Sequence, residues 1–257
     1  MPQQPSDRPE TEKYRDWSML SDKPIPIRER LIFALDVPTV DEARNLVEKL
    51  GDSIQFYKLG LEIFMAGGYY ETIEGLTRAG KKIFVDLKFF DVPNTVASAV
   101  RQLVKYKPKF ASVHGNDRIL ADACKEKGEI QILAVTVLTS LDQADIEALG
   151  FHVKIEDLVY SRAERAIKLG CDGVISSGIE VPRLRHGLGK GVTVVVPGIR
   201  PIQNNNDDQK RTVDVEEAFE KGADYIVIGR PIKDAKNPKE AAENIQARIA
   251  KIPFQSK

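Results

Sequence analysis

The chain lacks the features of a membrane or secreted protein. Its 257 residues include only two cysteines, Cys124 and Cys171, which do not form a Cys-x-x-Cys motif. No apolar run approaches the roughly 20 residues that cross a bilayer, and the N-terminus has no continuous hydrophobic segment like that of a signal peptide. We therefore expect a reduced cytoplasmic protein with no membrane partner, in which both cysteines are packing residues.

The sequence also lacks an excess of either charge. Lysine and arginine together number 38, as do aspartate and glutamate, so the formal net charge is zero. A chain without net charge has no overall field that attracts nucleic acid, and we expect no nucleic-acid partner. An anionic small molecule must then be bound by a local cluster of basic side chains.

Motifs for metals, nucleophiles and dinucleotides are absent as well. The three histidines, His114, His152 and His186, are scattered, without His-Glu-x-x-His or Cys/His spacing. No Gly-x-Ser-x-Gly elbow is present, and no Gly-x-Gly-x-x-Gly follows the first apolar run. A strand-end histidine such as His114 is more often a packed, hydrogen-bonded residue than a metal ligand.

What the chain does contain is an alternation of short apolar runs and longer amphipathic stretches. The apolar runs are continuous, as in parallel strands that are buried on both faces. Eight such pairs in about 225 residues predict a single α/β domain with the (β/α)8 TIM-barrel fold, and a doubly wound sheet is the competing topology. The predicted strands are Leu31–Leu35, Ile54–Leu59, Ile83–Leu87, Phe110–Val113, Ile130–Val137, Gly173–Ser176, Val192–Val196 and Tyr225–Ile228. The predicted helices include Val40–Leu50, Thr72–Ala79, Val96–Lys105, Ile119–Lys127, Ile155–Leu169 and Val215–Lys221.

Residues 1–30 are expected to form an N-terminal extension ahead of the barrel domain, residues 31–257. The extension holds five prolines among mostly polar residues, and its only apolar cluster is formed by Trp17 and Met19-Leu20. This composition predicts a flexible leader or a short arm that docks through Trp17.

The most informative stretch is 82–95, where three ionisable groups follow an apolar run. Asp86 and Lys88 are two residues apart, so they share one face of the predicted strand, and Asp91 follows them. Removing such charges from water costs several kcal/mol each unless they are paired. The spacing alone therefore indicates either a structural ion pair or a functional site.

Polar residues follow most of the predicted strands. In a barrel the C-terminal strand ends converge on one rim, where the chemistry takes place. Aspartates on this rim could hold Mg²⁺, but lysines among them supply the positive charge that a metal would bring, so we favour a site without metal or cofactor. The rim residues are Asp36, Lys58, Asp86, Lys88, His114, Thr136 or Thr139, Arg200, Gly229 and Arg230.

The last two loops of a barrel frequently bind phosphate. Here they read VPGIRP (Val196–Pro201) and IGRP (Ile228–Pro231). Their glycines let the backbone approach an anion, and their arginines can donate forked hydrogen bonds. Between them, Ile202–Arg211 is either a lid that closes over a phosphate, with Gln209 as one donor, or a solvated insertion.

Taken together, these motifs closely resemble the orotidine 5′-phosphate decarboxylases of the bacterial type, over roughly residues 31–250. Asp-x-Lys-x-x-Asp by itself also admits the related sugar-phosphate decarboxylases and hexulose-phosphate synthases. Thr139, Gln209 and the PGIRP loop favour the pyrimidine nucleotide. The resemblance rests on Ala-Leu-Asp36, Lys58, Asp86-x-Lys88-x-x-Asp91-x-x-x-Thr95, the VTVLTS segment, PGIRP, Asp208-Gln209 and IGRP.

The resemblance implies decarboxylation of orotidine 5′-monophosphate to UMP and CO₂, the last step of de novo pyrimidine nucleotide synthesis. Lys88 would protonate C6, Asp86 would lie beside the leaving carboxylate, and Lys58 would extend the charge array. Asp91 and Thr95 would reach the neighbouring active site of a homodimer, with Asp91 completing that array. The substrate-binding residues would be Asp36 for the ribose, Lys58, Asp86, Thr95, Thr139 for the pyrimidine side, and Arg200, Gln209, Gly229 and Arg230 for the phosphate.

A non-catalytic nucleotide sensor is the alternative from a different class. Such a protein would need the phosphate loops but not the Asp86, Lys88 and Asp91 array, and that array is present.

Overall fold

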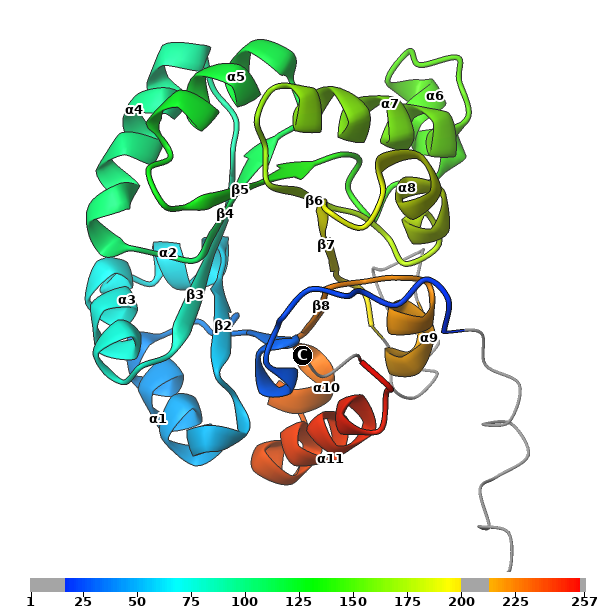
Figure 1. The fold of residues 1–257 in the computed structure, drawn as a ribbon. Coiled ribbons are helices and arrows are strands. Elements are labelled where there is room, and N and C mark those ends of the chain that lie inside the picture. Colours follow the sequence, from blue (N-terminus) through cyan, green and yellow to red (C-terminus); the bar gives the residue numbers. More distant parts are fainter. Residues whose placement is uncertain (1–16, 200–212, 255–257) are drawn as a thin grey trace, which may run out of the picture.

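The chain folds into a closed barrel of eight parallel strands in chain order, which confirms the predicted TIM barrel (Figure 1). The computed structural model describes residues 17–199 and 213–254. Each strand pairs with the next one along the chain, and β8 closes the barrel against β1. The strands are β1 (Leu31–Ala34), β2 (Phe56–Leu59), β3 (Lys82–Phe89), β4 (Phe110–His114), β5 (Gln131–Val135), β6 (Gly173–Ile175), β7 (Thr193–Val196) and β8 (Tyr225–Ile228).

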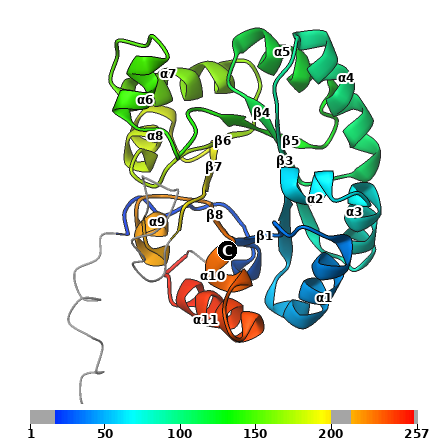
Figure 2. The same cartoon turned by 180° about the vertical axis from the view of Figure 1, so that it is seen from behind.

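Helices surround the barrel in both views (Figures 1 and 2). The start of α4 lies three residues before the predicted Val96, because Pro93 occupies the first helical turn, where its missing N–H is not needed. No helix in the described ranges is long and apolar enough to cross a membrane. The helices are α1 (Val40–Leu50), α2 (Leu61–Met65), α3 (Tyr69–Arg78), α4 (Pro93–Leu103), α5 (Asp117–Glu126), α6 (Gln143–Ala148), α7 (Ile155–Lys168), α8 (Val181–Leu188), α9 (Val215–Glu220), α10 (Arg230–Lys233) and α11 (Pro238–Ala250).

The strands divide their side chains between two apolar layers. Along β1, Leu31 and Phe33 join the large cluster between sheet and helices, whereas Ile32 and Ala34 join a smaller cluster inside the barrel. Both sets are buried, which explains why the strands read as continuous apolar runs. Aromatic rings fill the interior, so the barrel is a packed core rather than a pore.

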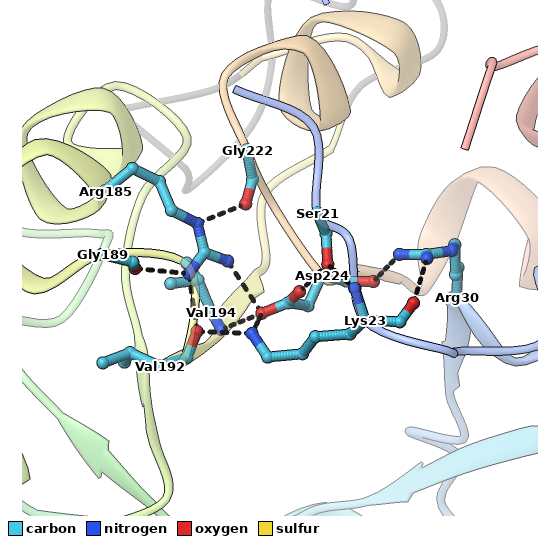
Figure 3. A network of polar contacts seen from close by, with 9 residues as sticks. All are labelled: Ser21, Lys23, Arg30, Arg185, Gly189, Val192, Val194, Gly222 and Asp224. Atoms are coloured by element: carbon cyan, nitrogen blue, oxygen red, sulfur yellow. Dashed lines mark hydrogen bonds and ion pairs between the residues drawn. The ribbon is translucent and has the colours of Figure 1, made fainter. Parts of the chain in front are cut away.

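The segment 17–30, which we expected to lie outside the barrel domain, packs against the barrel. Leu20 is buried in the outer core cluster, and Ile25 packs against the interior cluster. Both Ser21 and Lys23 bond to the carboxylate of Asp224, the residue before β8 (Figure 3). The segment therefore covers the end of the barrel at which the strands begin.

Candidate active site

A cavity of about 470 Å³ opens at the C-terminal strand ends. Its floor is the upper layer of the barrel interior, formed by Ala34, Phe84, Val135, Ile175, Val195 and Val227. Charged and hydroxyl side chains ring the cavity above that floor. They are Asp36, Lys58, Glu62, Asp86, Lys88, Thr139, Ser140, Arg230 and Lys233.

Four of these side chains form a row of alternating charge along the ends of β1, β2 and β3. The ammonium of Lys58 lies 3.2 Å from each oxygen of Asp36 and 3.6 Å from Oδ2 of Asp86. The same Asp86 oxygen lies 2.9 Å from Nζ of Lys88. The order of the row is therefore Asp36, Lys58, Asp86, Lys88.

Within the described ranges no three His, Cys, Asp or Glu side chains gather as metal ligands.

The inner pair of the row is largely removed from solvent. The side chains of Lys58 and Asp86 are only 11% and 9% exposed. Burial alone would raise the pKa of Asp86, but Lys58 and Lys88 outweigh it and hold that pKa below its usual value. Burial would lower the pKa of Lys58, but Asp86 and Asp36 outweigh it and raise that pKa. Both groups are therefore charged at neutral pH.

Ser112 on β4 fixes the end of β3. Lys88 has a left-handed backbone, with φ of 48°, and the pairing of β3 with β4 is irregular between Val85 and Phe89. The Lys88 N–H donates to Oγ of Ser112 at 2.9 Å, and that hydroxyl donates to Oδ1 of Asp86 at 2.8 Å. The sequence analysis missed Ser112 because it stands inside an apolar strand.

Two further residues that the sequence analysis missed shape the row. A Cβ atom on Gly60 would lie 2.9 Å from Oδ1 of Asp36 and 3.1 Å from Nζ of Lys58, so only glycine leaves room for that ion pair. Lys233 in α10 donates to the backbone carbonyl of Asp36 at 3.0 Å and adds a cation to the cavity wall.

The two glycine-containing loops after β7 and β8 meet at the cavity. Gly198 lines it with a left-handed backbone, φ of 75°. Gly229 caps α10, and Arg230 begins that helix at the cavity wall. The remaining expected phosphate ligands, Arg200 and Gln209, lie outside the described residues, as does the expected lid at 202–211.

Two rim candidates have other contacts. Thr139 lines the cavity, but the hydroxyl of Thr136 is buried and donates to the carbonyl of Ile175 at 3.0 Å. The ring of His114 lies 4.8 Å from that of Phe90 and is not part of the cavity wall. Thr136 and His114 therefore belong to the packing around the site.

Asp91 and Thr95 do not line the cavity of their own chain. Both are exposed, and the Asp91 carboxylate accepts the N–H of Val92 at 2.6 Å. The apolar side chains on either side of Asp91 are exposed as well, Phe90 by 62% and Val92 by 63%. The loop after β3 thus presents a carboxylate flanked by apolar surface.

Comparison with known proteins assigns the family. A family model described as "Orotidine 5′-phosphate decarboxylase / HUMPS family" matches residues 29–245. The chain belongs to this family. The match spans all eight strands of the barrel.

Individual members of the orotidine 5′-phosphate decarboxylase / HUMPS family are similar over nearly their whole length. The chain is 56% identical to an orotidine 5′-phosphate decarboxylase of Methylococcus capsulatus over 236 residues, covering 91% of this chain and 98% of that protein. It is 45% identical to the Stenotrophomonas maltophilia protein of the same name, over 90% of this chain and 98% of that one. Among solved structures, an orotidine 5′-phosphate decarboxylase from Lactobacillus acidophilus has a TM-score of 0.76 at 33% identity, covering 86% of this chain and 99% of that one.

Proposed function

We propose that the chain is a cytoplasmic decarboxylase that converts orotidine 5′-monophosphate to UMP and CO₂ in pyrimidine nucleotide synthesis. The observation that carries the proposal is the alternating row of Asp36, Lys58, Asp86 and Lys88 at the mouth of the barrel, with its inner pair buried. Relatives at 56% and 45% identity carry the name of this activity, which favours it over the synthases of the same family.

The chemistry requires a fixed positive charge beside one ring carbon. Loss of CO₂ from the pyrimidine leaves an electron pair on C6 that the ring delocalises poorly. Two unit charges about 4 Å apart attract by roughly 4 kcal/mol at an effective dielectric constant near 20. The ammonium of Lys88 would therefore favour the transition state as charge builds on C6, and it would then donate its proton to that carbon.

Asp86 has two tasks in this scheme. Its carboxylate holds the ammonium of Lys88 at 2.9 Å, and Lys58 and Ser112 hold the carboxylate in turn. A substrate carboxylate placed beside Asp86 would meet a charge of the same sign, and departure of CO₂ would remove that repulsion. Because the row is already assembled, little reorganisation is needed when the substrate binds.

The rest of the cavity suits a nucleotide. Asp36 would bind the ribose, Thr139 the pyrimidine, and the loops of Gly198 and Gly229 with Arg230 the phosphate. We propose that Arg200, Gln209 and Thr95 also contact the nucleotide. Binding energy from the distant phosphate would hold the ring against the charge row, so removal of phosphate contacts should lower turnover as well as affinity.

The proposed assembly is a homodimer with shared active sites. Asp91 and Thr95 do not line their own cavity, and exposed Phe90 and Val92 flank Asp91 with apolar surface that a second copy would cover. In this arrangement Asp91 would complete the charge array of the neighbouring site.

The test is the decarboxylation of orotidine monophosphate, followed by its ultraviolet absorbance in metal-free buffer. We expect activity from the wild type, and a loss of at least about a thousandfold in kcat for Lys88→Ala with the fold retained. Lys107→Ala is the matched control, because Lys107 is the other lysine with a left-handed backbone in the described ranges and is exposed outside the cavity. We expect it to keep wild-type turnover.

Two results would contradict the proposal. Near-native turnover of a folded Lys88→Ala variant would remove Lys88 from the role of proton donor. A wild-type protein that is inactive on orotidine monophosphate but active on a hexulose phosphate would favour the other branch of the family.

A further inference from the structure

Two thiols that are 47 residues apart in the sequence meet on the outer wall of the barrel. Cys124 lies in α5, and Cys171 lies in the turn between α7 and β6. Their sulfur atoms are 3.5 Å apart, both thiols are free, and neither lines the cavity. These are the only cysteines of the chain, and their sequence spacing gave no sign that they touch.

The backbones that carry the two thiols are tied together by a separate set of bonds. The side chain of Lys127, the residue after α5, donates to the carbonyl of Gly170 at 2.8 Å and pairs with Asp172 at 2.7 Å. Gly170 and Asp172 are the residues on either side of Cys171. Gly170 has φ of 98°, and a Cβ atom there would lie 3.7 Å from Cβ of Cys124. The close approach of the thiols therefore does not depend on a bond between them.

This geometry is suited to a disulfide. The sulfur atoms of a disulfide are about 2.05 Å apart, and the bond tolerates little backbone strain. The thiols already lie in van der Waals contact at 3.5 Å. An S–S bond would form by rotation of the Cys124 and Cys171 side chains toward each other. The bonds from Lys127 to Gly170 and Asp172 would keep the end of α5 beside the turn that carries Cys171.

The two thiols are not equivalent. The hydrogen bond with Cys171 lowers the pKa of the Cys124 thiol, and the positive charge of Lys127 acts in the same direction. That same hydrogen bond, together with burial, raises the pKa of Cys171. Cys124 is half-buried, whereas Cys171 is buried. Cys124 is thus the more accessible and more acidic thiol, and Cys171 is the protected thiol behind it.

We propose that Cys124 and Cys171 are a peroxide-reactive pair that forms a disulfide within the chain. The Cys124 thiolate attacks one oxygen of the peroxide and breaks the O–O bond, which gives a sulfenic acid and hydroxide. The sulfur of Cys171 then attacks the Cys124 sulfur, the S–S bond forms, and the sulfenic oxygen leaves as water with the Cys171 proton. The two thiols lose two electrons to the peroxide, and a dithiol reductant reverses the reaction.

The disulfide would close a long loop of the barrel wall. The closed loop 124–171 contains β5, α6, α7 and the cavity residue Thr139. Cross-linking a loop of this length restricts the unfolded chain, so the oxidised protein is expected to melt several degrees higher, on the order of the gain seen for other long loops.

The experiment treats the full-length reduced protein with hydrogen peroxide, then blocks remaining thiols with an alkylating reagent under denaturing conditions. We expect both thiols to be alkylated before oxidation and neither afterwards. Peptide mapping should show one cross-linked fragment that contains Cys124 and Cys171, in a protein that has kept its assembly state. Treatment with a dithiol should restore both thiols.

Single variants distinguish the two roles. In Cys171→Ser, Cys124 should still react with peroxide and accumulate as a sulfenic acid that dimedone traps. In Cys124→Ser, peroxide oxidation of Cys171 should be at least about tenfold slower. Lys127→Met should slow the oxidation of Cys124 and lower the yield of disulfide, because the positive charge near Cys124 and the bonds to Gly170 and Asp172 are lost together.

Three outcomes would overturn the proposal. They are thiols that are both alkylated after peroxide treatment, a disulfide that forms only between chains, and equal peroxide reactivity of the two single variants. If a serine variant does not fold, the peptide map of the oxidised wild type decides the question by itself. None of these measurements depends on the proposed decarboxylase activity.

Discussion

Ser112 links the backbone of Lys88 to the carboxylate of Asp86. Ser112→Ala removes one acceptor and one donor at once, and leaves the Lys88 N–H and Oδ1 of Asp86 without this partner. Small misplacement of a catalytic group costs up to about a hundredfold in rate. We expect kcat for orotidine monophosphate to fall by about 10- to 100-fold with little change in KM, measured by steady-state kinetics.

The control for this prediction is another buried serine. The hydroxyl of Ser53 donates to the carbonyl of Leu50 at 2.6 Å, and Ser53 is not part of the cavity wall. Ser53→Ala should reduce stability by about 1 kcal/mol and leave kcat unchanged. Equal kinetic effects of the two substitutions would show that Ser112 acts only through general stability.

His114 makes the stability of the folded chain depend on pH. Burial, and then the positive charges of Arg162 and Lys88, lower the pKa of His114 below its usual 6.5. The unfolded chain therefore binds a proton at this residue more readily than the folded chain does. The stability that depends on neutral His114 is present above pH 6.5 and is lost as the pH falls through the folded-state pKa.

We expect His114→Gln to flatten the pH dependence of the free energy of unfolding below pH 6.5. Urea denaturation at a series of pH values measures this slope directly. His152→Gln is the control, because that histidine is exposed. If the His114 variant keeps the wild-type slope, other groups cause the acid sensitivity.

Among the elements, the strands were the most predictable part of the chain. The bounds of β8 and α1 equal the predicted ranges, because an apolar run and an amphipathic run each begin and end there. The charge row was also accessible from sequence, since charges at the end of an apolar strand are conspicuous. The short helices α2 and α10 were not assigned, because single turns carry too little periodicity.

Contacts between distant elements could not be predicted from the same patterns. Ser112 reads as core because its strand is buried on both faces, and the approach of Cys124 to Cys171 depends on how α5 packs beside the turn before β6. The docking of the segment 17–30 depends on Asp224, which looks like an ordinary loop carboxylate in the sequence. Such contacts are set by tertiary packing, which local periodicity does not report.

Asp224 joins four elements at the end of the barrel opposite the cavity (Figure 3). One carboxylate oxygen accepts bonds from Arg185 of α8, from Lys23 and from the N–H of Val194 in β7, each at 2.8 Å, and the other accepts the hydroxyl of Ser21. The carboxylate is fully buried, as is almost all of the Arg185 side chain. This network ties the N-terminal segment to α8, β7 and β8.

We expect Asp224→Ala to destabilise the protein by about 3–5 kcal/mol, because it leaves the buried charge of Arg185 without its partner. Thermal or urea denaturation measures the loss. Turnover per folded molecule should be unchanged, since the candidate site lies at the other end of the strands. Asp157→Ala is the control, because its ion pair with Arg183 at 2.6 Å is half exposed and should contribute less than about 1 kcal/mol. If both variants lose a similar free energy of unfolding, the buried Asp224 network contributes no more to stability than an exposed ion pair.

For the whole molecule, the residues expected to stabilise the fold and those proposed to carry out the reaction lie at opposite ends of the barrel. The N-terminal end carries the Asp224 network and the segment 17–30, and the C-terminal end carries the cavity and the charge row. Yet the row within one chain ends at Lys88, because Asp91 does not line the cavity that its own chain forms. If the proposed mechanism holds, the functional unit is larger than one chain.

Mixed dimers test this directly. Lys88→Ala and Asp91→Ala should each be nearly inactive alone. In a dimer that pairs one copy of each, one site receives both lesions and the other receives none, because the intact Lys88 and the intact Asp91 meet there. Random pairing of equal amounts makes half of the dimers mixed, so co-expression should restore about a quarter of the wild-type activity. If the mixture stays at the background of the two parents although mixed dimers form, Asp91 acts within its own chain.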